Sequence, residues 1–291
     1  MKRPLLFTAA AVTLPLFAAM TASAQAGPPQ AEMATETSTV EGVNKIILVG
    51  DSTTATGNGW GPMFCAHHTT HPTACLNLAR NGRSSGSYRA EGLWDVALNE
   101  MKVAGYGTVF VLIGFGHNDQ PGKPGRSTDL KSEFPANMRR YVREAREAGA
   151  VPVLFTPLTR RLFRDGEVER DLDPWAEAIR QIAAETDTPL VDLNGRSTQI
   201  VQAMGPSVQN LLAEIPAPPQ VAAAAAIDGE TLPSATGRPT PAPVPDTLRV
   251  AKMTWVYDYT HLGEFGGKLF AAVMADELAS EVPEMRRLLR P

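Results

Sequence analysis

The sequence predicts an α/β fold: a doubly wound, five-stranded parallel sheet between two layers of helices, in the flavodoxin-like strand order 2-1-3-4-5. Short apolar runs rich in β-branched residues recur along the chain, and stretches with helical spacing of apolar residues lie between them. The run 109–113 is apolar at every position, which is typical of a strand covered on both faces. Alternating strands and helices favour a parallel sheet with helices on both sides.

Five segments are expected to form the strands, because each is short, apolar and followed by turn residues. In chain order they are 45–49, 76–79, 108–115, 151–156 and 190–193. The predicted order places the carboxyl ends of the first three strands next to one another. In such sheets a ligand binds beyond those ends, where the strand order reverses.

Three helices are expected from the spacing of apolar residues. The first ends at Gly149, since glycine readily takes the left-handed conformation, and its apolar residues are Phe134, Met138, Val142 and Ala145. The second begins with Asp173 as N-cap and Pro174 as the first helical residue. The third is the last in the chain, with an apolar face of Leu262, Phe265, Leu269 and Val273.

The first 26 residues have the layout of a cleaved secretory signal peptide. Lys2 and Arg3 precede an apolar run over 5–20, and cleavage is expected after Ala24 or Ala26. The apolar run is shorter than the roughly 20 residues that span a membrane. We therefore expect a secreted or periplasmic protein that is not attached to a membrane after cleavage.

The remainder is expected to form one domain over 44–291, after a flexible segment at 27–43. From about 213 to 246 the domain is rich in alanine and proline, a composition that cannot bury much core. We expect a long, partly disordered surface insertion there, with a lid over the site as the alternative. The net charge of −4 and the lack of a basic tract give no reason to expect a nucleic-acid partner.

The two cysteines, Cys65 and Cys75, could form a disulfide in an oxidising compartment or be two small buried side chains. Between them lie His67, His68 and His71, which raise the possibility of a zinc site. Their spacing matches no established ligand pattern, so we expect a solvated loop and no metal.

Polar or small residues follow each of the first three expected strands, namely Ser52, Gly82 and Asn118. In the predicted strand order they meet in one crevice, although Ser52 and Asn118 are 66 positions apart. A serine needs a base to take its proton, and that base is usually a histidine oriented by a carboxylate. His261 has Asp258 three residues before it, although Asp258 could instead cap the final helix.

Four blocks of sequence resemble the SGNH (GDSL-type) hydrolases, in the right order and over residues 45–278 apart from the insertion. They are Gly50-Asp51-Ser52, Gly82, Gly116-His117-Asn118-Asp119 and Asp258-Tyr259-Thr260-His261. The resemblance implies that Ser52, Asp258 and His261 form the catalytic triad. It also implies that the N–H groups of Ser52 and Gly82 and the Asn118 amide stabilise the oxyanion.

The segments 81–85, 91–95, 114–120, 156–161 and 189–193 further resemble the rhamnogalacturonan acetylesterases of carbohydrate esterase family 12. That branch implies an enzyme that removes O-acetyl groups from a plant cell-wall polysaccharide, acetylated pectin, without metal or organic cofactor. We expect a monomer whose partner is the acetylated polysaccharide. The Ala/Pro-rich insertion departs from the compact pattern of the branch.

Residues 82–86 also match the Gly-x-Ser-x-Gly elbow of α/β-hydrolases, which would make Ser84 the nucleophile. This alternative is disfavoured because 86–88 is expected to continue irregularly, and because it ignores the other strand ends. Four arginines are expected in loops after strands, where they could pair with uronic acid carboxylates or simply be solvated: Arg83, Arg89, Arg160 and Arg161.

Two other functions stay open. The first is an esterase of the same fold that acts on acetylated xylan, small aryl esters or lipids. The second is an inactive carbohydrate-binding protein that uses the same cleft, which is disfavoured because every catalytic position holds a competent residue.

Overall fold

The structure is a computed structural model that describes residues 42–232 and 257–290. The expected signal peptide with its cleavage sites, nearly all of the segment 27–43 and the second part of the insertion lie outside the described residues. The expected domain boundaries therefore stay predictions.

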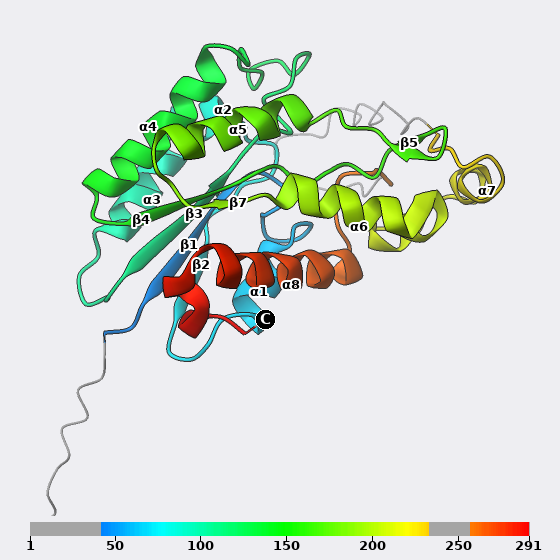
Figure 1. The fold of residues 1–291 in the computed structure, drawn as a ribbon. Coiled ribbons are helices and arrows are strands. Elements are labelled where there is room, and N and C mark those ends of the chain that lie inside the picture. Colours follow the sequence, from blue (N-terminus) through cyan, green and yellow to red (C-terminus); the bar gives the residue numbers. More distant parts are fainter. Residues whose placement is uncertain (1–41, 233–256, 291) are drawn as a thin grey trace, which may run out of the picture. The chain divides into compact units, whose positions relative to one another are not determined.

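A five-stranded parallel sheet forms the centre of the described domain (Figure 1). Its strands are β1 (Lys45–Gly50), β2 (Ala74–Asn77), β3 (Val109–Gly114), β4 (Val151–Phe155) and β7 (Leu190–Val191). They lie in the order β2-β1-β3-β4-β7, which confirms the predicted order 2-1-3-4-5. Every residue of β1 and β3 is buried, as expected for strands covered on both faces.

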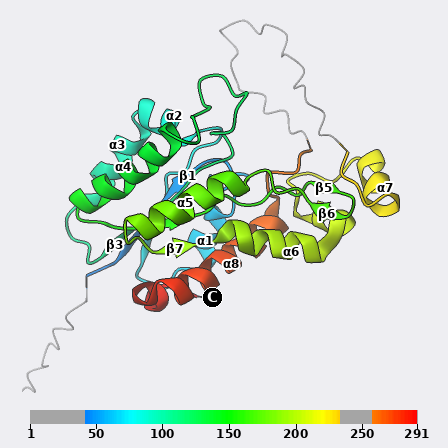
Figure 2. The same cartoon turned by 45° about the horizontal axis from the view of Figure 1, so that its top comes forward.

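Helices cover both faces of the sheet. Ile47 and Val49 of β1 pack in a core with α2 (Ser85–Ala90), α3 (Leu93–Met101), α4 (Glu133–Glu147) and α5 (Asp173–Glu185). Ile46 and Leu48 pack on the opposite face with α1 (Gly61–His67), α6 (Leu193–Val208) and α8 (Glu264–Glu281). Figure 2 shows α4 and α5 side by side on their face of the sheet. The expected three-layer α/β/α architecture is therefore confirmed.

Shorter elements lie outside these layers. The hairpin of β5 (Phe163–Arg164) and β6 (Glu167–Val168) follows β4, and the 3-10 helix η1 (Gln209–Leu212) follows α6. The helix α7 (Pro219–Ile227) comes next, and the 3-10 helix η3 (Pro283–Leu288) follows α8. None of the helices in the described ranges is long and apolar enough to cross a membrane.

Two strand boundaries differ from the prediction. The strand β2 begins at Ala74 and ends two residues early, because the Asn77 side chain bonds the Ala79 N–H at 3.1 Å in a local turn. The strand β7 has only two residues, because the Asp192 carboxylate accepts the Gly195 N–H at 3.3 Å and begins α6. The other three predicted strands agree with the structure to within one residue at each end.

The predicted cap of α5 is wrong. Asp173 is already the first helical residue and Leu172 is the N-cap, while the Asp173 carboxylate pairs with Arg170 at 2.7 Å. A carboxylate in the first turn still interacts favourably with the N-terminal end of the helix dipole. By contrast, α4 buries the apolar residues that were expected, and Gly149 follows it at φ 82°.

The predicted apolar face of α8 is correct in part, because Leu262 is buried just before the helix and Leu269 and Val273 pack against the core, whereas Phe265 does not. Phe265 is 55% exposed, and the buried face consists of Phe270, Met274, Leu278 and the small residues between them. Gly266 lies so close to η1 that a Cβ there would stand 2.4 Å from the Leu212 carbonyl oxygen. Glycine and alanine make this close packing possible, and a search for large apolar side chains misses such a face.

The described part of the Ala/Pro-rich segment, 213–232, forms a helix and contributes to a small core cluster, which its composition did not suggest. Alanine favours helix and Pro219 is tolerated in the first turn, so α7 forms. Val221 of this helix belongs to a small core cluster with Tyr257 and Tyr259. This part of the segment therefore packs beside the predicted Asp258–His261 region.

Cys65 and Cys75 form a disulfide with their Cα atoms 5.4 Å apart, which joins α1 to β2. His68, between them, bonds the Arg290 carbonyl oxygen through Nδ1 at 2.7 Å. Within the described ranges no group of three or more histidine, cysteine, aspartate or glutamate side chains comes together as a metal site would require.

Candidate active site

Ser52 lies in a tight turn directly after β1. The Asp51 carboxylate accepts the Thr53 N–H at 2.9 Å and the Thr53 hydroxyl at 2.8 Å, and the Asp51 carbonyl accepts the Thr54 and Ala55 N–H groups. These bonds stabilise the turn that places Ser52 at the carboxyl end of the sheet.

The predicted base and its orienting carboxylate both lie next to Ser52. His261 Nε2 is 3.0 Å from the Ser52 hydroxyl oxygen, and His261 Nδ1 is 2.6 Å from Asp258 Oδ2. The other Asp258 oxygen accepts the Thr260 N–H at 2.8 Å and the His261 N–H at 2.7 Å. Gly263 is the N-cap of α8, so the alternative role of Asp258 as a helix cap is set aside.

The electrostatics of this pair suit a general base. Burial raises the pKa of Asp258, but hydrogen bonds and the charge of His261 bring it down to about 2. Burial lowers the pKa of His261, but Asp258, with smaller contributions from Glu214 and Asp51, raises it above the usual value overall. The carboxylate therefore stays ionised beside an imidazole that readily takes a proton.

The predicted oxyanion donors come from three strand ends. Neither the Ser52 N–H nor the Gly82 N–H donates to any other residue that the structure describes. Gly82 has φ 76°, a conformation that favours glycine. Asn118 adjoins the same turn, because its Nδ2 donates to the Arg83 carbonyl at 3.1 Å. Among the described residues, the backbone N–H groups of Ser52 and Gly82 are therefore free to donate to a negatively charged oxygen.

A second histidine–aspartate pair adjoins Ser52, and it was not predicted, although both residues belong to the sequence blocks that follow the first and third strands. His117 Nδ1 lies 3.3 Å from Asp51 Oδ2, and both side chains are 3% exposed. Burial and the neighbouring cations Arg160 and Lys123 lower the pKa of His117, although Asp51 opposes them. The pKa of Asp51 is lowered as well, so an ionised carboxylate faces a neutral imidazole, and we assign this pair to the support of the Ser52 turn.

Asp119, the last residue of the same block, does not face Ser52. Its carboxylate accepts the Ser85 hydroxyl at 2.6 Å and the Thr128 hydroxyl at 2.8 Å. It thereby joins the start of α2 to the loop that follows β3. Burial raises its pKa to about 6, and the hydrogen bonds oppose that shift.

Ser84, the competing nucleophile, is the N-cap of α2 and fully buried. Its hydroxyl accepts the Ser87 N–H at 3.1 Å, so it is engaged in a capping box. The expectation that 86–88 continues irregularly is wrong, since these residues lie in α2. Even so, several residues separate β2 from α2, which is unlike a direct strand-to-helix elbow.

Arg161 is not available to a substrate, contrary to the prediction. It is 1% exposed, and Nη2 donates to the carbonyl oxygens of Asp258 at 2.9 Å and His261 at 3.1 Å. Its Nη1 donates to the Thr260 carbonyl at 3.3 Å. Arg161 therefore positions the backbone of the segment that carries the histidine and its carboxylate.

The other predicted arginines differ in their surroundings. Arg160 forms an ion pair with Asp171 and donates to the Thr260 hydroxyl at 3.2 Å. Arg83 pairs with Glu91 at 2.8 Å and is about one third exposed. Arg89 lies in α2 rather than in a loop, pairs with Glu144 and is largely buried, so its predicted place is wrong.

Comparison with known proteins identifies the family of the chain. The model of the GDSL-like lipase/acylhydrolase family matches residues 48–214 of the chain. The chain is 32% identical to the probable rhamnogalacturonan acetylesterase YesY of Bacillus subtilis over 161 residues, 53% of this chain and 72% of YesY. It is 33% identical to rhamnogalacturonan acetylesterase RhgT of the same organism over 170 residues, 56% of this chain and 70% of RhgT.

Two solved structures share the fold. The structure of Bacillus subtilis YxiM has a TM-score of 0.57 and 22% identity, covering 82% of this chain and 57% of that chain. A catalytic mutant of Axe2, an acetylxylan esterase from Geobacillus stearothermophilus, has a TM-score of 0.50 and 16% identity. The match covers 80% of this chain and 93% of the Axe2 chain. The family match covers more than half of the full sequence. The chain is therefore an enzyme of the GDSL-like lipase/acylhydrolase family.

Proposed function

We propose that the chain is a serine esterase that removes O-acetyl groups from a polysaccharide. The observation that carries this proposal is the continuous hydrogen-bonded series from Ser52 through His261 to Asp258, with distances of 3.0 and 2.6 Å. This is the order of groups that activates a serine hydroxyl.

In the first half of the reaction the Ser52 oxygen attacks the acetyl carbonyl while His261 Nε2 takes its proton. The tetrahedral intermediate then expels the sugar oxygen, which receives that proton from His261, and an acetyl-enzyme remains. Water attacks the acetyl-enzyme with His261 again as base, and acetate and the free Ser52 hydroxyl are released. Asp258 keeps the imidazole in the tautomer that leaves Nε2 facing Ser52.

The oxyanion of each tetrahedral intermediate would lie between the N–H groups of Ser52 and Gly82 and the amide of Asn118. Donors already in place cost no reorganisation as the charge develops. The absence of other acceptors for the Ser52 and Gly82 N–H groups among the described residues supports this role.

For the polysaccharide itself we propose acetylated pectin, of the rhamnogalacturonan type. The names of YesY and RhgT, with which the chain shares about a third of its residues over the matched regions, support this choice. Acetylated xylan is the competing substrate.

The experiment is acetate release from acetylated pectin, xylan and mannan, with Ser52→Ala as the control. We expect the highest kcat/KM on pectin and no release by Ser52→Ala beyond background. A higher kcat/KM on xylan would contradict the pectin assignment alone. No hydrolysis of any acetate ester, including a chromogenic one, would contradict the esterase and favour an inactive carbohydrate-binding protein.

We also propose that the chain is exported and acts outside the cytoplasm. Residues 1–26 have the pattern of a signal peptide, and the Cys65–Cys75 disulfide suits an oxidising compartment. Sequencing the N-terminus of protein from the periplasm and the medium should give a start at Gln25 or Gly27. A mature chain that keeps the first 24 residues would contradict this proposal.

A further inference from the structure

Three cations lie at one edge of the catalytic crevice, and each contacts the site. Arg126 Nη1 is 3.3 Å from Asn118 Oδ1 and 3.5 Å from the Gly82 carbonyl oxygen. Lys123 Nζ donates to the carbonyl oxygen of His117, the residue before Asn118. Arg160 Nε donates to Thr260, the residue before His261.

The loop that carries Lys123 and Arg126 is well connected. The Ser127 hydroxyl donates to the Gln120 carbonyl at 2.8 Å and accepts the Lys123 N–H at 2.9 Å. The Thr128 hydroxyl donates to the buried Asp119 at 2.8 Å. These bonds order the backbone that carries the two cations before any ligand binds, which reduces the ordering cost of binding.

The three cations are close enough to repel one another. Burial lowers the pKa of Lys123, and Arg160 and Arg126 lower it further, to about 8. Asp171 offsets part of this charge through its ion pair with Arg160. Asp51 opposes the repulsion as well, but its carboxylate is engaged by Thr53 and His117.

No carboxylate in the described ranges offsets the charge of Arg126 in this way. Arg126 is exposed and forms no ion pair with any residue in the described ranges, whereas Arg83 in the adjacent turn pairs with Glu91 at 2.8 Å. Close positive charges with one unpaired guanidinium form a site that an anion would stabilise.

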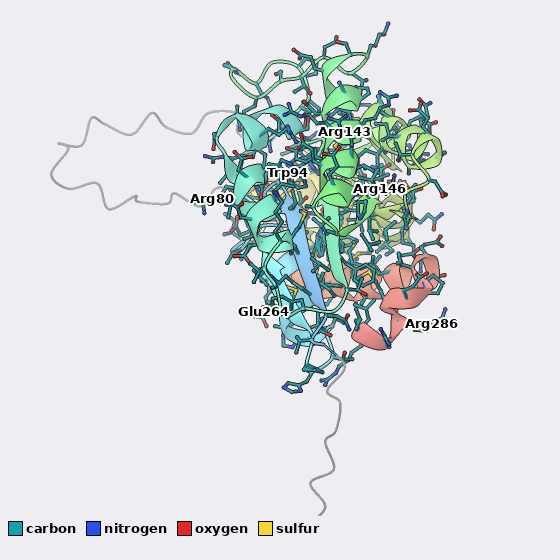
Figure 3. The ribbon with its side chains drawn as sticks, turned by 90° about the vertical axis from the view of Figure 1, so that its left-hand side faces the viewer. Arg80, Trp94, Arg143, Arg146, Glu264 and Arg286 are labelled. Atoms are coloured by element: carbon teal, nitrogen blue, oxygen red, sulfur yellow. A yellow bond between two sulfur atoms is a disulfide. The ribbon has the colours of Figure 1, made fainter. Side chains whose placement is uncertain are left out.

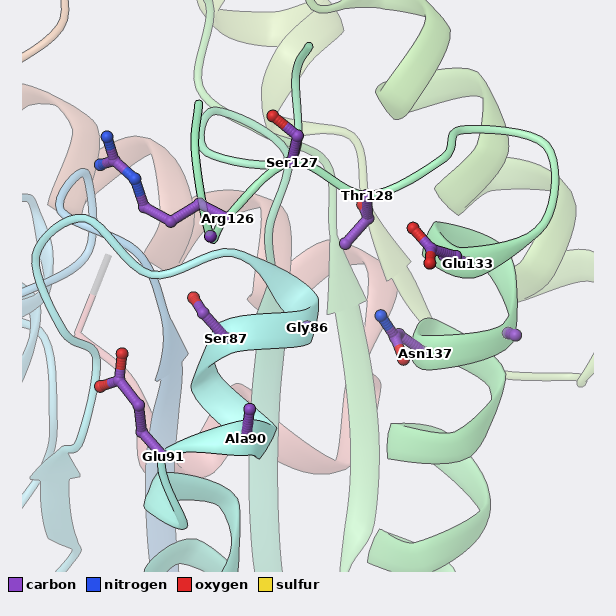
Figure 4. A pocket seen from close by; sticks show the side chains of 11 residues that line it. Gly86, Ser87, Ala90, Glu91, Arg126, Ser127, Thr128, Glu133 and Asn137 are labelled. Atoms are coloured by element: carbon purple, nitrogen blue, oxygen red, sulfur yellow. The ribbon is translucent and has the colours of Figure 1, made fainter. Parts of the chain in front are cut away.

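The position of Arg126 places such an anion next to the ester. A hollow of about 640 Å³ lies between α2 and the start of α4, and Glu91 and Glu133 line it together with Arg126. Figure 4 shows the Arg126 guanidinium pointing away from Glu133 and Asn137. Its hydrogen bonds are to the Gly82–Asn118 pair instead, so the acidic hollow is not where a carboxylate would bind.

We propose that Lys123, Arg126 and Arg160 form a subsite for the carboxylate of a uronic acid, at or next to the acetylated sugar. A guanidinium binds a carboxylate through two parallel hydrogen bonds, and Lys123 adds a compact charge. This inference rests on the proposed function, and it makes an anionic glycan, rather than neutral xylan, the preferred substrate.

The test is calorimetric binding to Ser52→Ala, which cannot turn over the ligand. The probes are trigalacturonate and its methyl ester, which differ in charge but little in shape. We expect the acid to bind about tenfold more tightly than the ester at low salt. The difference should shrink at about 0.5 M salt, where charges are screened over a few ångströms.

Adding Arg126→Gln to Ser52→Ala should bring the two affinities to within about threefold, and Arg126→Lys should keep part of the difference. The matched control is Arg143→Gln, which removes an exposed arginine on α4 that pairs with Glu147 (Figure 3). The Arg143→Gln variant should keep the full difference in affinity between trigalacturonate and its methyl ester. Equal affinities in Ser52→Ala, or a full difference in the Arg126→Gln variant, would overturn the inference.

These outcomes separate the inference from the proposed function, because the binding measurement does not depend on hydrolysis. A wild-type chain that hydrolyses no ester contradicts the function but leaves a charge-dependent affinity in place. An active esterase that binds the acid and its methyl ester equally contradicts only the carboxylate subsite.

Discussion

Two histidine–aspartate pairs adjoin Ser52, and they differ in burial and in what the second ring nitrogen contacts. His261 and Asp258 are 28% and 31% exposed, their side chains are 2.6 Å apart, and His261 Nε2 reaches the Ser52 hydroxyl. His117 and Asp51 are 3% exposed and 3.3 Å apart, and His117 Nε2 has no hydrogen-bond partner among the described residues.

The difference shows that pairing a histidine with a carboxylate does not by itself make a base. Burial lowers the pKa of both imidazoles, but Asp258 outweighs it at His261, whereas burial outweighs Asp51 at His117. One ring is ready to accept a proton from a hydroxyl, and the other stays neutral under the turn that carries that hydroxyl.

Removing each imidazole in turn should separate the two roles most clearly. His261→Ala should lower kcat about 10⁴-fold with little change in thermal stability, because it removes the base. His117→Gln should lower kcat less than about tenfold but lower the melting temperature by several degrees, because it disturbs a buried pair. Chromogenic acetate hydrolysis and thermal unfolding measure both. Equal losses of kcat would contradict the assignment of roles.

The carboxylates should differ in the same way. Asp258→Asn should lower kcat about 10³-fold or more, since an amide no longer favours the imidazolium and allows the wrong tautomer. Asp51→Asn should mainly lower the melting temperature, because it replaces a buried carboxylate that accepts hydrogen bonds from Thr53 and His117. If Asp51→Asn lost as much kcat as Asp258→Asn with an unchanged melting temperature, the second pair would be part of the chemistry.

A substitution of Arg161 should displace His261 and Asp258 without removing either side chain. Arg161→Lys cannot keep all three bonds to the carbonyls of 258, 260 and 261, so kcat should fall about 10- to 100-fold with KM nearly unchanged. Arg164→Lys is the matched control, since Arg164 is 74% exposed on the β5–β6 hairpin. A rise in KM at constant kcat would indicate a substrate contact instead.

The smallest expected effect is on pH dependence. His261 must be neutral to act, and its pKa is raised above 6.5, so kcat/KM for a neutral ester should fall as pH drops through a midpoint above 6.5. The same shift stabilises the fold below 6.5, and that contribution disappears as pH rises through the raised pKa. The lowered pKa of His117 has the opposite sign, so its contribution is lost as pH falls below 6.5. Activity that is flat from pH 8 to pH 4 would contradict the role of His261.

Much of the site was predictable because it depends on strand ends. Once the strand order is predicted, Ser52, Gly82 and Asn118 must adjoin, since parallel strands end at the same edge of the sheet. The three-residue spacing of Asp258 and His261 also suits a local hydrogen bond. Periodicity and turn chemistry bring these residues together, whereas their catalytic roles were inferred from the resemblance to the SGNH hydrolases.

What could not be predicted depends on burial of polar groups and on close packing. Arg161 looks like a surface charge in the sequence, and only the fold shows three carbonyls around it. Arg126 and Lys123 lie in a loop without regular spacing, so nothing in the sequence places them beside Asn118. The buried face of α8 relies on small residues such as Gly266, which hydrophobic patterns ignore.

The most direct test of the account is covalent labelling of the nucleophile with a phosphonate ester, followed by peptide mass spectrometry. We predict one label per chain, on Ser52, with labelling that slows strongly in His261→Ala and is absent in Ser52→Ala. A label on Ser84 or another serine in the wild type, or labelling that proceeds unchanged in His261→Ala, would contradict the account.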